Sequence, residues 1–460
     1  MWTQRDQLQA YRFLRRRVVS AVQFGDANHP IAPGRRTVIA TASGTGAALL
    51  AAVAVLVYSV FRPGTSADWR RPGQIVIEKE SGAGFVLGAD GLLHPVLNHA
   101  SARLLIGGGR TVSITAARLA DAPRGMPLGI PDAPATLPAR NQLITGPWAV
   151  CTEGTETTLI IGGLAPPPAG QDRPDDRRSL DDRALLVTGP DDDRHLITAG
   201  RRMALQDGAA VALGYDAVQP RPVTREWLDA IPEGPPLAPL AVEGAGRQGP
   251  RLGGNGQRSR SGQVLRTEDV GGASRYYLVT TTALRPITET EAALIVGNPA
   301  NRAAYPDGEP RALPVPAADI AADLVENGDD NPGYPDRLPD AVPGGDLADA
   351  LCTADGTLWT AGGPPLPANA RALPAPENQA TAADAVWLPP GTGVLIGGDD
   401  DTPSYLVGDR GIRYPLADAD AAKALGYDGV RASVPPKDLV SLLPVGPELS
   451  VQGARQEFRR

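Results

Sequence analysis

The longest stretch of the chain without a charged residue covers residues 37–61. As a helix, these 25 residues would measure about 37 Å, more than the roughly 30 Å hydrocarbon core of a bilayer. The run is longer than the apolar core of a cleaved signal peptide, and the 36 residues before it exceed an ordinary signal-peptide head. The pattern predicts one uncleaved transmembrane helix within residues 37–62, with Tyr58 and Phe61 at the membrane interface.

A second apolar pattern precedes the membrane segment. Between residues 4 and 24, large apolar side chains recur at helical spacing, with arginines crowding the remaining positions. Such a helix lies on an anionic inner leaflet or presents its apolar side to a partner. A basic anchor without a partner is the plainer alternative. The candidate partner-binding residues are Leu8, Tyr11, Leu14, Arg15, Arg16, Arg17 and Val18.

Beyond the membrane segment, one short pattern occurs four times. Each copy opens with an apolar triplet, turns through polar or Gly residues, returns to an apolar position and enters a short Ala-rich helix. The copies begin at Phe85, Leu185, Tyr277 and Tyr405. Residues 213–237 align without gaps to residues 425–449 and are identical at nine of 25 positions. The pattern predicts four related β-β-α repeats.

A second element, Pro-x-Gly-x-x-Leu, closes three of the four copies. It covers residues 123–128, 232–237 and 444–449, and the third copy has "AADIAADLVENG" in its place. We call this element the closing motif.

The two cysteines lie in similar segments between the copies. "CTEGTETTLIIGG" follows the first copy from Cys151, and "CTADGTLWTAGG" follows the third from Cys352. Residues 158–163, 385–388 and 393–398 are typical of strands and are expected in one shared central sheet. The chain beyond the membrane therefore divides into two related halves with approximate twofold symmetry.

The expected fold class is mixed α/β (α+β), a transmembrane helix followed by an elongated four-repeat body around a central β core. Residues 165–183 and 244–262 are expected to be linkers from their Pro, Gly and charged residues. The expected boundaries are 1–36 for the cytosolic basic helix, 37–62 for the membrane helix, 70–137, 185–243, 263–330 and 403–450 for repeats one to four, 138–184 and 331–402 for the core strands with Cys151 and Cys352, 244–262 for a flexible linker and 451–460 for the tail.

Charge is distributed unevenly and predicts the orientation of the chain. Residues 1–36 hold seven arginines and two acidic residues, whereas the rest holds 37 basic and 50 acidic residues. A basic flank on one side of a span stays in the cytosol, so residues 63–460 are expected outside it. An acidic body also argues against nucleic-acid binding. With two cysteines in an oxidising compartment, one intramolecular disulfide is the natural pairing.

Motifs for catalysis and for metal binding are missing from the sequence. None of the three lysines follows a Gly-x-x-x-x-Gly sequence, so there is no P-loop. The four histidines lack metal-ligand spacing, and the aspartate triplets at 191–193 and 399–401 lack that of a calcium loop. There is no Gly-x-Ser-x-Gly nucleophile elbow. We expect no catalytic residue, no metal and no cofactor.

Several motifs together resemble the EccB family, the membrane core subunit of the actinobacterial type VII (ESX) secretion system. They are "QLQAYRFLRRRVVSAV" at 7–22, "DGLLHPVLNHASARLLIG" at 90–107, "LADAPRGMPLGIPDAP" at 119–134 and "WAVC" at 148–151. The resemblance implies an inner-membrane protein with a periplasmic body and a Cys151–Cys352 disulfide. It implies assembly with an EccC-type FtsK-like ATPase, EccD, EccE and other copies of itself.

The expected function is that of a structural subunit that assembles and stabilises the export channel and its extracytoplasmic mouth. The alternative is an envelope ATPase or hydrolase of the same system, because some members of the resembled family are described as ATP-hydrolysing. A cell-wall-binding anchor is a third class, which the small number of aromatic residues available for sugar stacking disfavours.

Overall fold

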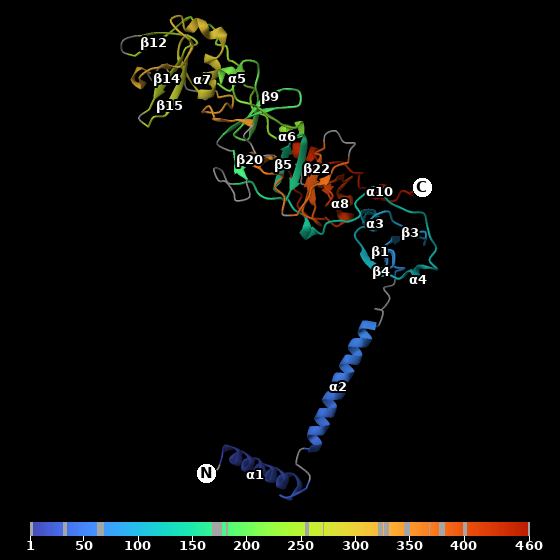
Figure 1. The fold of residues 1–460 in the computed structure, drawn as a ribbon. Coiled ribbons are helices and arrows are strands. Elements are labelled where there is room, and N and C mark those ends of the chain that lie inside the picture. Colours follow the sequence, from blue (N-terminus) through green and yellow to red (C-terminus); the bar gives the residue numbers. More distant parts are fainter. Residues whose placement is uncertain are drawn as a thin grey trace. The chain divides into compact units, whose positions relative to one another are not determined.

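The computed structural model describes residues 3–30, 35–61, 69–167, 177–180, 183–253, 257–269, 271–320, 325, 331–344, 350–367, 369–376, 382–398 and 403–458. The chain divides into two compact units, Met1–Arg70 and Arg71–Arg460. The described part of the first unit is helical, and every described strand belongs to the second (Figure 1).

The first unit consists of α1 (Gln4–Phe24) and α2 (Arg35–Phe61). Thr3 and Asp6 cap the start of α1: the Thr3 hydroxyl donates to the Asp6 carboxylate at 2.7 Å, and the Thr3 amide donates to the same oxygen at 3.0 Å. These hydrogen bonds lower the pKa of Asp6. Gly25 ends the helix in the left-handed conformation, φ 67°, which glycine adopts without steric cost.

Four small sheets of the second unit contain the segments in which the sequence pattern recurs. The first sheet has the order β3-β2-β1-β4, in which β1 pairs antiparallel with β2 and parallel with β4. The second and third sheets, β10-β9-β8-β11 and β16-β15-β14-β17, have their strands in the corresponding order. The fourth has the order β23-β24-β25, and Ser433 forms the parallel bridge to Ile396 of β23.

The bounds of these elements follow the chain. In the first sheet they are β1 (Gln74–Glu78), β2 (Gly84–Leu87), β3 (Leu93–Pro95), α3 (His99–Ile106), β4 (Arg110–Ile114) and α4 (Ala116–Leu119). In the second they are β8 (Ala184–Thr188), β9 (Arg194–Thr198), β10 (Arg201–Ala204), α5 (Ala209–Ala212), β11 (Arg221–Pro222) and α6 (Arg225–Asp229). In the third they are β14 (Val264–Glu268), β15 (Ser274–Val279), β16 (Leu284–Ile287), α7 (Glu289–Val296), η2 (Pro299–Ala304), β17 (Leu313–Pro314) and η3 (Ala317–Asp319). In the fourth they are β23 (Val394–Gly397), β24 (Pro403–Val407), β25 (Arg413–Pro415), α8 (Ala419–Leu425), α9 (Lys437–Ser441) and, in the tail, α10 (Val451–Ala454).

The number of strands in each copy corrects the sequence pattern. Three strands, not two, precede each short helix α3, α5, α7 and α8. Leu185 lies in β8, the first strand of its sheet, whereas Tyr405 lies in β24, the second. Adjacent hairpin strands carry similar apolar triplets, so the pattern alone does not identify which strand opens a copy. The alignment of these two segments was therefore wrong by one strand.

The small sheets pack in pairs that join residues distant in sequence. Helix α3 contacts α8 and α10, and α5 contacts α7 (Figure 1). Ala100 and Leu104 of α3 share one buried cluster with Ala421 and Leu425 of α8. The first copy therefore packs on the fourth, and the second packs on the third.

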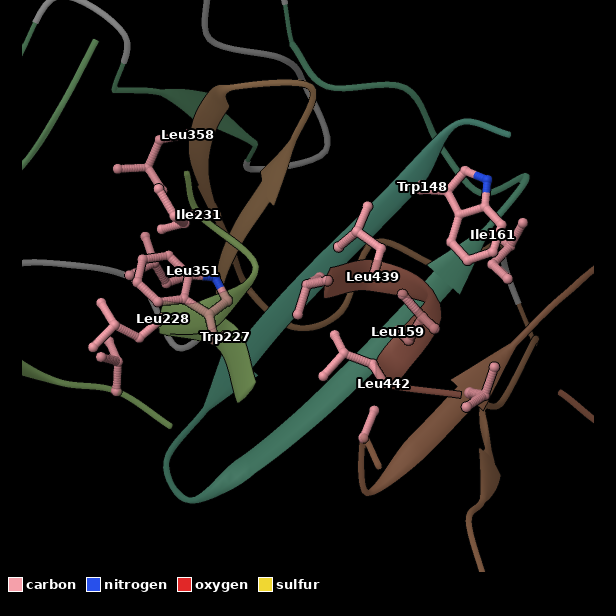
Figure 2. Close-up of a cluster of buried hydrophobic side chains, with 14 of the residues drawn as sticks. Trp148, Leu159, Ile161, Trp227, Leu228, Ile231, Leu351, Leu358, Leu439 and Leu442 are labelled. Atoms are coloured by element: carbon pink, nitrogen blue, oxygen red, sulfur yellow. The ribbon is translucent and has the colours of Figure 1, made fainter. Parts of the chain in front are cut away.

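A seven-stranded sheet lies at the centre, with the order β21-β22-β6-β5-β19-β20-β7. Its bounds are β5 (Trp148–Glu153), β6 (Glu156–Ile161), β7 (Arg178–Ser179), β19 (Ala350–Ala354), β20 (Thr357–Ala361), β21 (Leu373–Pro374) and β22 (Ala385–Trp387); η1 (Arg140–Gln142) precedes it and β18 (Ala341–Val342) pairs with β8. Burial on both faces explains the continuous apolar runs of β5, β6 and β19. Figure 2 shows one face, where Trp227 and Leu228 of α6 and Leu439 of α9 pack on the strands.

Two further expectations are corrected by the fold. Residues 393–398 were expected in the central sheet, but β23 pairs with β24 in the fourth small sheet. Residues 244–262 were expected to be a flexible linker, but they contain the antiparallel hairpin of β12 (Gln248–Leu252) and β13 (Gln257–Arg260). Leu252 is buried against Val279 and Leu265, so composition alone misidentified a strand pair as a linker. Most of the linker expected at 165–183 lies outside the described residues, and its described part includes β7.

Candidate assembly surfaces

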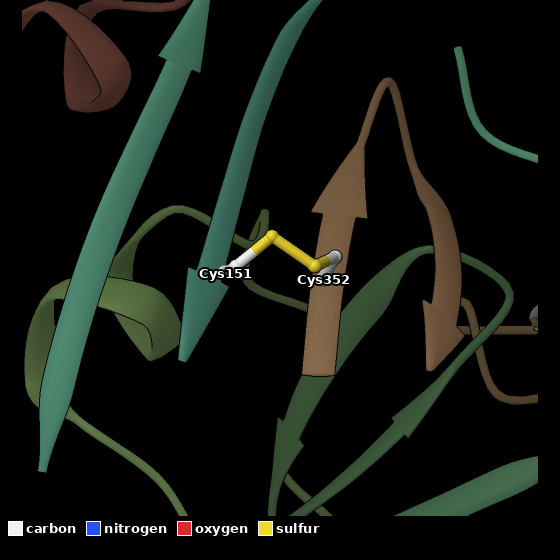
Figure 3. Close-up of a disulfide and its surroundings, with 2 residues drawn as sticks. All are labelled: Cys151 and Cys352. Carbon is white, nitrogen blue, oxygen red and sulfur yellow. A yellow bond between two sulfur atoms is a disulfide. The ribbon is translucent and has the colours of Figure 1, made fainter. Parts of the chain in front are cut away.

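The disulfide Cys151–Cys352 joins the two halves at the centre of the large sheet. Cys151 of β5 and Cys352 of β19 are direct cross-strand partners with Cα atoms 4.0 Å apart (Figure 3). Both sulfurs lie in a buried cluster with Trp359 and Trp387. The bridge closes a loop with a sequence separation of 201 residues, for which loop entropy predicts a stabilisation of about 5 kcal/mol.

Two tyrosines make equivalent hydrogen bonds between the halves. The Tyr215 hydroxyl donates to the Pro339 carbonyl at 2.5 Å, and the Tyr427 hydroxyl donates to the Pro138 carbonyl at 2.9 Å. Both tyrosines are buried, and burial raises the pKa of each hydroxyl well above its ordinary value. In each half, a neutral tyrosine hydroxyl therefore donates a hydrogen bond to the other half. The acceptors lie in the segments that precede β18 and β5.

The same two segments also pair with strands of the opposite half. Ala341 and Val342 of β18 pair in parallel with β8. Leu143 forms a parallel bridge to Gly393, just before β23. The halves are therefore interlaced by backbone pairing as well as by the disulfide.

The closing motif makes the same backbone contacts in three copies. In the first copy, the Leu93 amide donates to the Pro123 carbonyl, the Gly125 amide donates to the Leu93 carbonyl, and the Leu128 amide donates to the Pro95 carbonyl. The corresponding bonds of the other two copies join Arg202 with Pro232, Gly234 with Arg202 and Leu237 with Ala204, and Arg413 with Pro444, Gly446 with Arg413 and Leu449 with Pro415. In the third copy, Val325 forms a parallel bridge to Leu284.

Helix α1 presents large apolar side chains to solvent. Leu8, Tyr11, Leu14 and Val18 are 54%, 67%, 63% and 57% exposed. This degree of exposure is unusual for residues of this type at helical spacing, which normally pack against a core. The four side chains form an uncovered stripe in the described unit, which we call the α1 stripe.

Two side chains modify the surface predicted for α1. Arg15 follows Tyr11 by four residues and precedes Val18 by three, so it lies on the α1 stripe rather than beside it. Phe13, which the periodicity missed because it falls off the stripe, is 62% exposed, and the Arg17 guanidinium lies 5.7 Å from its ring centroid. Arg16 is exposed as well.

Helix α2 holds one segment long and apolar enough to cross a membrane, Val38–Val55. None of this window is buried by the rest of the described structure. The Thr45 hydroxyl donates to the Thr41 carbonyl at 2.8 Å, which satisfies one polar group of the thinly apolar half of the helix. The side chains of Tyr58 and Phe61 lie outside the described residues.

His94 and Asp191, which belong to the histidines and acidic clusters considered above, make hydrogen bonds and an ion pair within the fold. His94 in β3 contacts the Met126 carbonyl through Nδ1 at 2.8 Å and the Asp90 carboxylate through Nε2 at 3.0 Å. Asp191 pairs with Arg225 at the β8–β9 turn, and the triplet at 399–401 lies outside the described residues. Among the described side chains, no three His, Cys, Asp or Glu residues gather in a way that could hold a metal ion.

Comparison with known proteins covers the whole chain. A family model described as "Type VII secretion system ESX-1, transport TM domain B" matches residues 1–459. The ESX-3 secretion system ATPase EccB3 of Mycolicibacterium smegmatis is 28% identical over 97% of this chain and 89% of its own length. The ESX-5 secretion system ATPase EccB5 of Mycobacterium tuberculosis is 28% identical over 97% of this chain and 92% of its own.

Solved structures match over similar lengths. A chain of the intact ESX-5 inner membrane complex, composite C3 model, has a TM-score of 0.68 and 26% identity, covering 100% of this chain and 96% of that chain. A chain of the periplasmic assembly from the ESX-5 inner membrane complex has a TM-score of 0.63 and 25% identity, covering 87% and 98%.

Proposed function

The chain belongs to the EccB family of type VII (ESX) secretion proteins and is a structural subunit of an inner-membrane secretion complex, and from this premise we propose how its parts serve that assembly. Helix α1 binds cytosolic partners, α2 anchors the chain, and the sheets of the second unit shape the extracytoplasmic mouth of the channel. The observation that carries the proposal is the match over residues 1–459, which includes every one of these parts.

The proposed orientation places the N-terminus in the cytosol and residues 63–460 in the periplasm. It is supported by the arginine excess before α2 and by the apolar window Val38–Val55. The disulfide agrees with it, because such bonds persist in oxidising compartments. A similar chain belongs to the periplasmic assembly of an ESX-5 complex. A reporter fused after Arg460 that proved cytosolic would contradict this orientation.

The proposed partners are an EccC-type FtsK-like ATPase, EccD, EccE and further copies of the chain, with α1 as the cytosolic contact. The α1 stripe supports this because four exposed apolar side chains favour a protein or lipid surface over water. Arg15 within the stripe favours a partner surface that offers a carboxylate or phosphate at its centre.

The test is extraction in mild detergent followed by identification of the co-purifying chains. The double variant Leu14→Asp, Val18→Asp should lose cytosolic partners while remaining in the membrane. The matched control Gln9→Asp, Gln23→Asp adds the same charge to exposed positions on the side of α1 away from the stripe and should retain them. Recovery of the unmodified protein alone, without a large membrane partner, would contradict the assembly role.

We also propose that the second unit consists of four related repeats with approximate twofold symmetry between halves. The repeated strand order, the shared hydrogen bonds of the closing motif and the paired Tyr215 and Tyr427 contacts support this organisation. Under this proposal the fourth repeat begins at β23 rather than at residue 403, and the third includes the hairpin β12–β13.

ATP hydrolysis is the second candidate function, because the relatives' names describe those proteins as ATPases. The three lysines of this chain lie on separate elements, after β1, in α8 and at the start of α9. Turnover of ATP by the purified chain, abolished by one side-chain substitution that leaves folding intact, would support this function. Turnover that disappears when an EccC-type protein is removed would oppose it.

A further inference from the structure

The hairpin β12–β13 is held firmly on the third small sheet. Leu252 packs in a buried cluster with Leu265 and Val279. Ser259 is also buried, and its hydroxyl donates to the Pro250 carbonyl across the hairpin. The Ser261 amide donates to the Arg247 carbonyl at 2.8 Å and fixes the hairpin base.

The opposite face of the hairpin carries arginines. Arg258 and Arg260 are two residues apart on β13, with buried Ser259 between them, so they share the exposed face. Arg251 of β12 is the direct cross-strand partner of Arg258 and is exposed. We call Arg251, Arg258 and Arg260 the arginine face.

Within the described residues, no carboxylate forms an ion pair with the arginine face. Arg260 donates from Nη1 to the Gly246 carbonyl at 3.0 Å, which is an uncharged acceptor. Asp319 lies beside Gly253 at the hairpin end, where its backbone carbonyl accepts from the Gly253 amide. Like charges directly opposite on paired strands are unfavourable, so the Arg251–Arg258 pair favours an anionic surface placed over it.

We propose that the arginine face docks on the acidic surface of a second copy of this chain. The residues beyond position 36 carry 50 acidic and 37 basic residues, so identical neighbours repel one another unless a basic patch meets the acidic surface. This inference rests on the assembly role proposed above and assigns one of its contacts. It also gives a reason for a strand pair here, because paired strands place the three arginines on one face at fixed backbone spacing.

The experiment uses the full chain in mild detergent, co-expressed with two different affinity tags. The triple variants Arg251→Glu, Arg258→Glu, Arg260→Glu and the milder Gln series are compared with Arg110→Glu, Arg118→Glu, Arg371→Glu, which changes the same charge at exposed positions elsewhere. Co-capture of the two tags and particle mass are measured at low and high salt. The arginine-face Glu variant should weaken copy–copy association about tenfold at low salt, and added salt should shrink its difference from the parent. The control should match the parent.

Each outcome decides between named alternatives. Equal co-capture by the Glu variant and the parent overturns the inference, while recovery of EccC-type partners by both leaves the assembly role standing. Loss of binding to anionic lipid vesicles with unchanged co-capture assigns the arginine face to a membrane and overturns it too. Aggregation of the Gln variant with unchanged specific association assigns the arginines to protecting exposed strand edges, again against the proposal. Melting temperatures within about 3 °C of the parent show that the variants fold.

Discussion

At the residue scale, two buried tyrosine hydroxyls hold the halves of the second unit together. Tyr215 and Tyr427 each donate to a proline carbonyl of the opposite half. The sequence marks both positions as identical in an internal alignment, but their acceptors lie 124 and 289 residues away. Only the fold explains why the tyrosines are equivalent.

Replacing Tyr427 by Phe should destabilise the chain by about 1–3 kcal/mol, since the Pro138 carbonyl would lose its partner in a buried site. Urea unfolding followed by tryptophan fluorescence measures this change. Tyr11→Phe is the control, because Tyr11 is exposed and its change should stay within about 0.5 kcal/mol. An unaltered midpoint for Tyr427→Phe would show that the hydrogen bond contributes nothing net.

Buried His195 should make the second unit less stable in mild acid. Burial, and to a lesser degree Arg202, lower its pKa, with Asp193 opposing the shift. The unfolded chain, with an ordinary histidine pKa near 6.5, binds the proton more readily, so stability falls as the pH drops through that value. Burial lowers the pKa of His99 as well.

The measurement is the urea midpoint of parent and His195→Gln at pH 7.5 and 5.5. The variant should lose less stability on acidification than the parent, whereas His29→Gln, a change in the first unit, should follow the parent. Identical acid sensitivity in parent and His195→Gln would refute the assignment.

At the element scale, the contacts of the closing motif account for its proline, glycine and leucine. Its glycine lets a side chain of the neighbouring strand lie on the backbone: a Cβ at Gly446 would lie 2.5 Å from two Tyr414 ring carbons, and a Cβ at Gly125 would strike the His94 ring. Proline supplies a carbonyl acceptor while needing no donor partner of its own. Leu128, Leu237 and Leu449 end the three motifs, and Leu237 and Leu449 are fully buried.

Gly446→Ala should therefore lower stability by about 1–3 kcal/mol through overpacking against buried Tyr414. Gly308→Ala is the matched control, because nothing lies within 4 Å of a Cβ there. Thermal melting compares the two. Equal melting temperatures would mean that the Tyr414 ring moves aside at no cost.

At the scale of the whole molecule, the halves are linked by the disulfide, by the two tyrosine hydrogen bonds and by backbone pairing. The disulfide joins β5 to β19, β18 pairs with β8, and Leu143 bridges to Gly393. Removing one kind of contact should loosen the body without separating its halves.

The double variant Cys151→Ser, Cys352→Ser should cost about 2–5 kcal/mol, because the unfolded chain regains the entropy of a long loop. Its melting temperature should fall, while limited proteolysis should still recover both halves together. An unchanged melting point would show that the bridge does not constrain the unfolded state. Separation of the halves would show that the backbone pairing is weaker than the structure suggests.

The sequence by itself determined the features that depend on neighbouring residues. The uncharged run of 37–61 and the apolar spacing of 4–24 correspond to α2 and α1, because helix formation and hydropathy are read within a few turns. The motifs at 90–107 and 119–134 pointed to the EccB family, and the whole-chain match confirmed it. The partner-binding role of α1 and the twofold symmetry remain predictions.

Tertiary structure alone decided which strands pair and which segments cross between halves. The assignment of residues 393–398 to the central sheet was wrong, and so was the reading of 244–262 as a flexible linker, because Gly, Pro and Arg content does not reveal that Leu252 and Ser259 are buried. The local sequence pattern could not predict the hydrogen-bond acceptors of Tyr215 and Tyr427 either. Register and partner choice depend on burial shared by residues far apart in the chain, and such burial leaves no local periodicity to read.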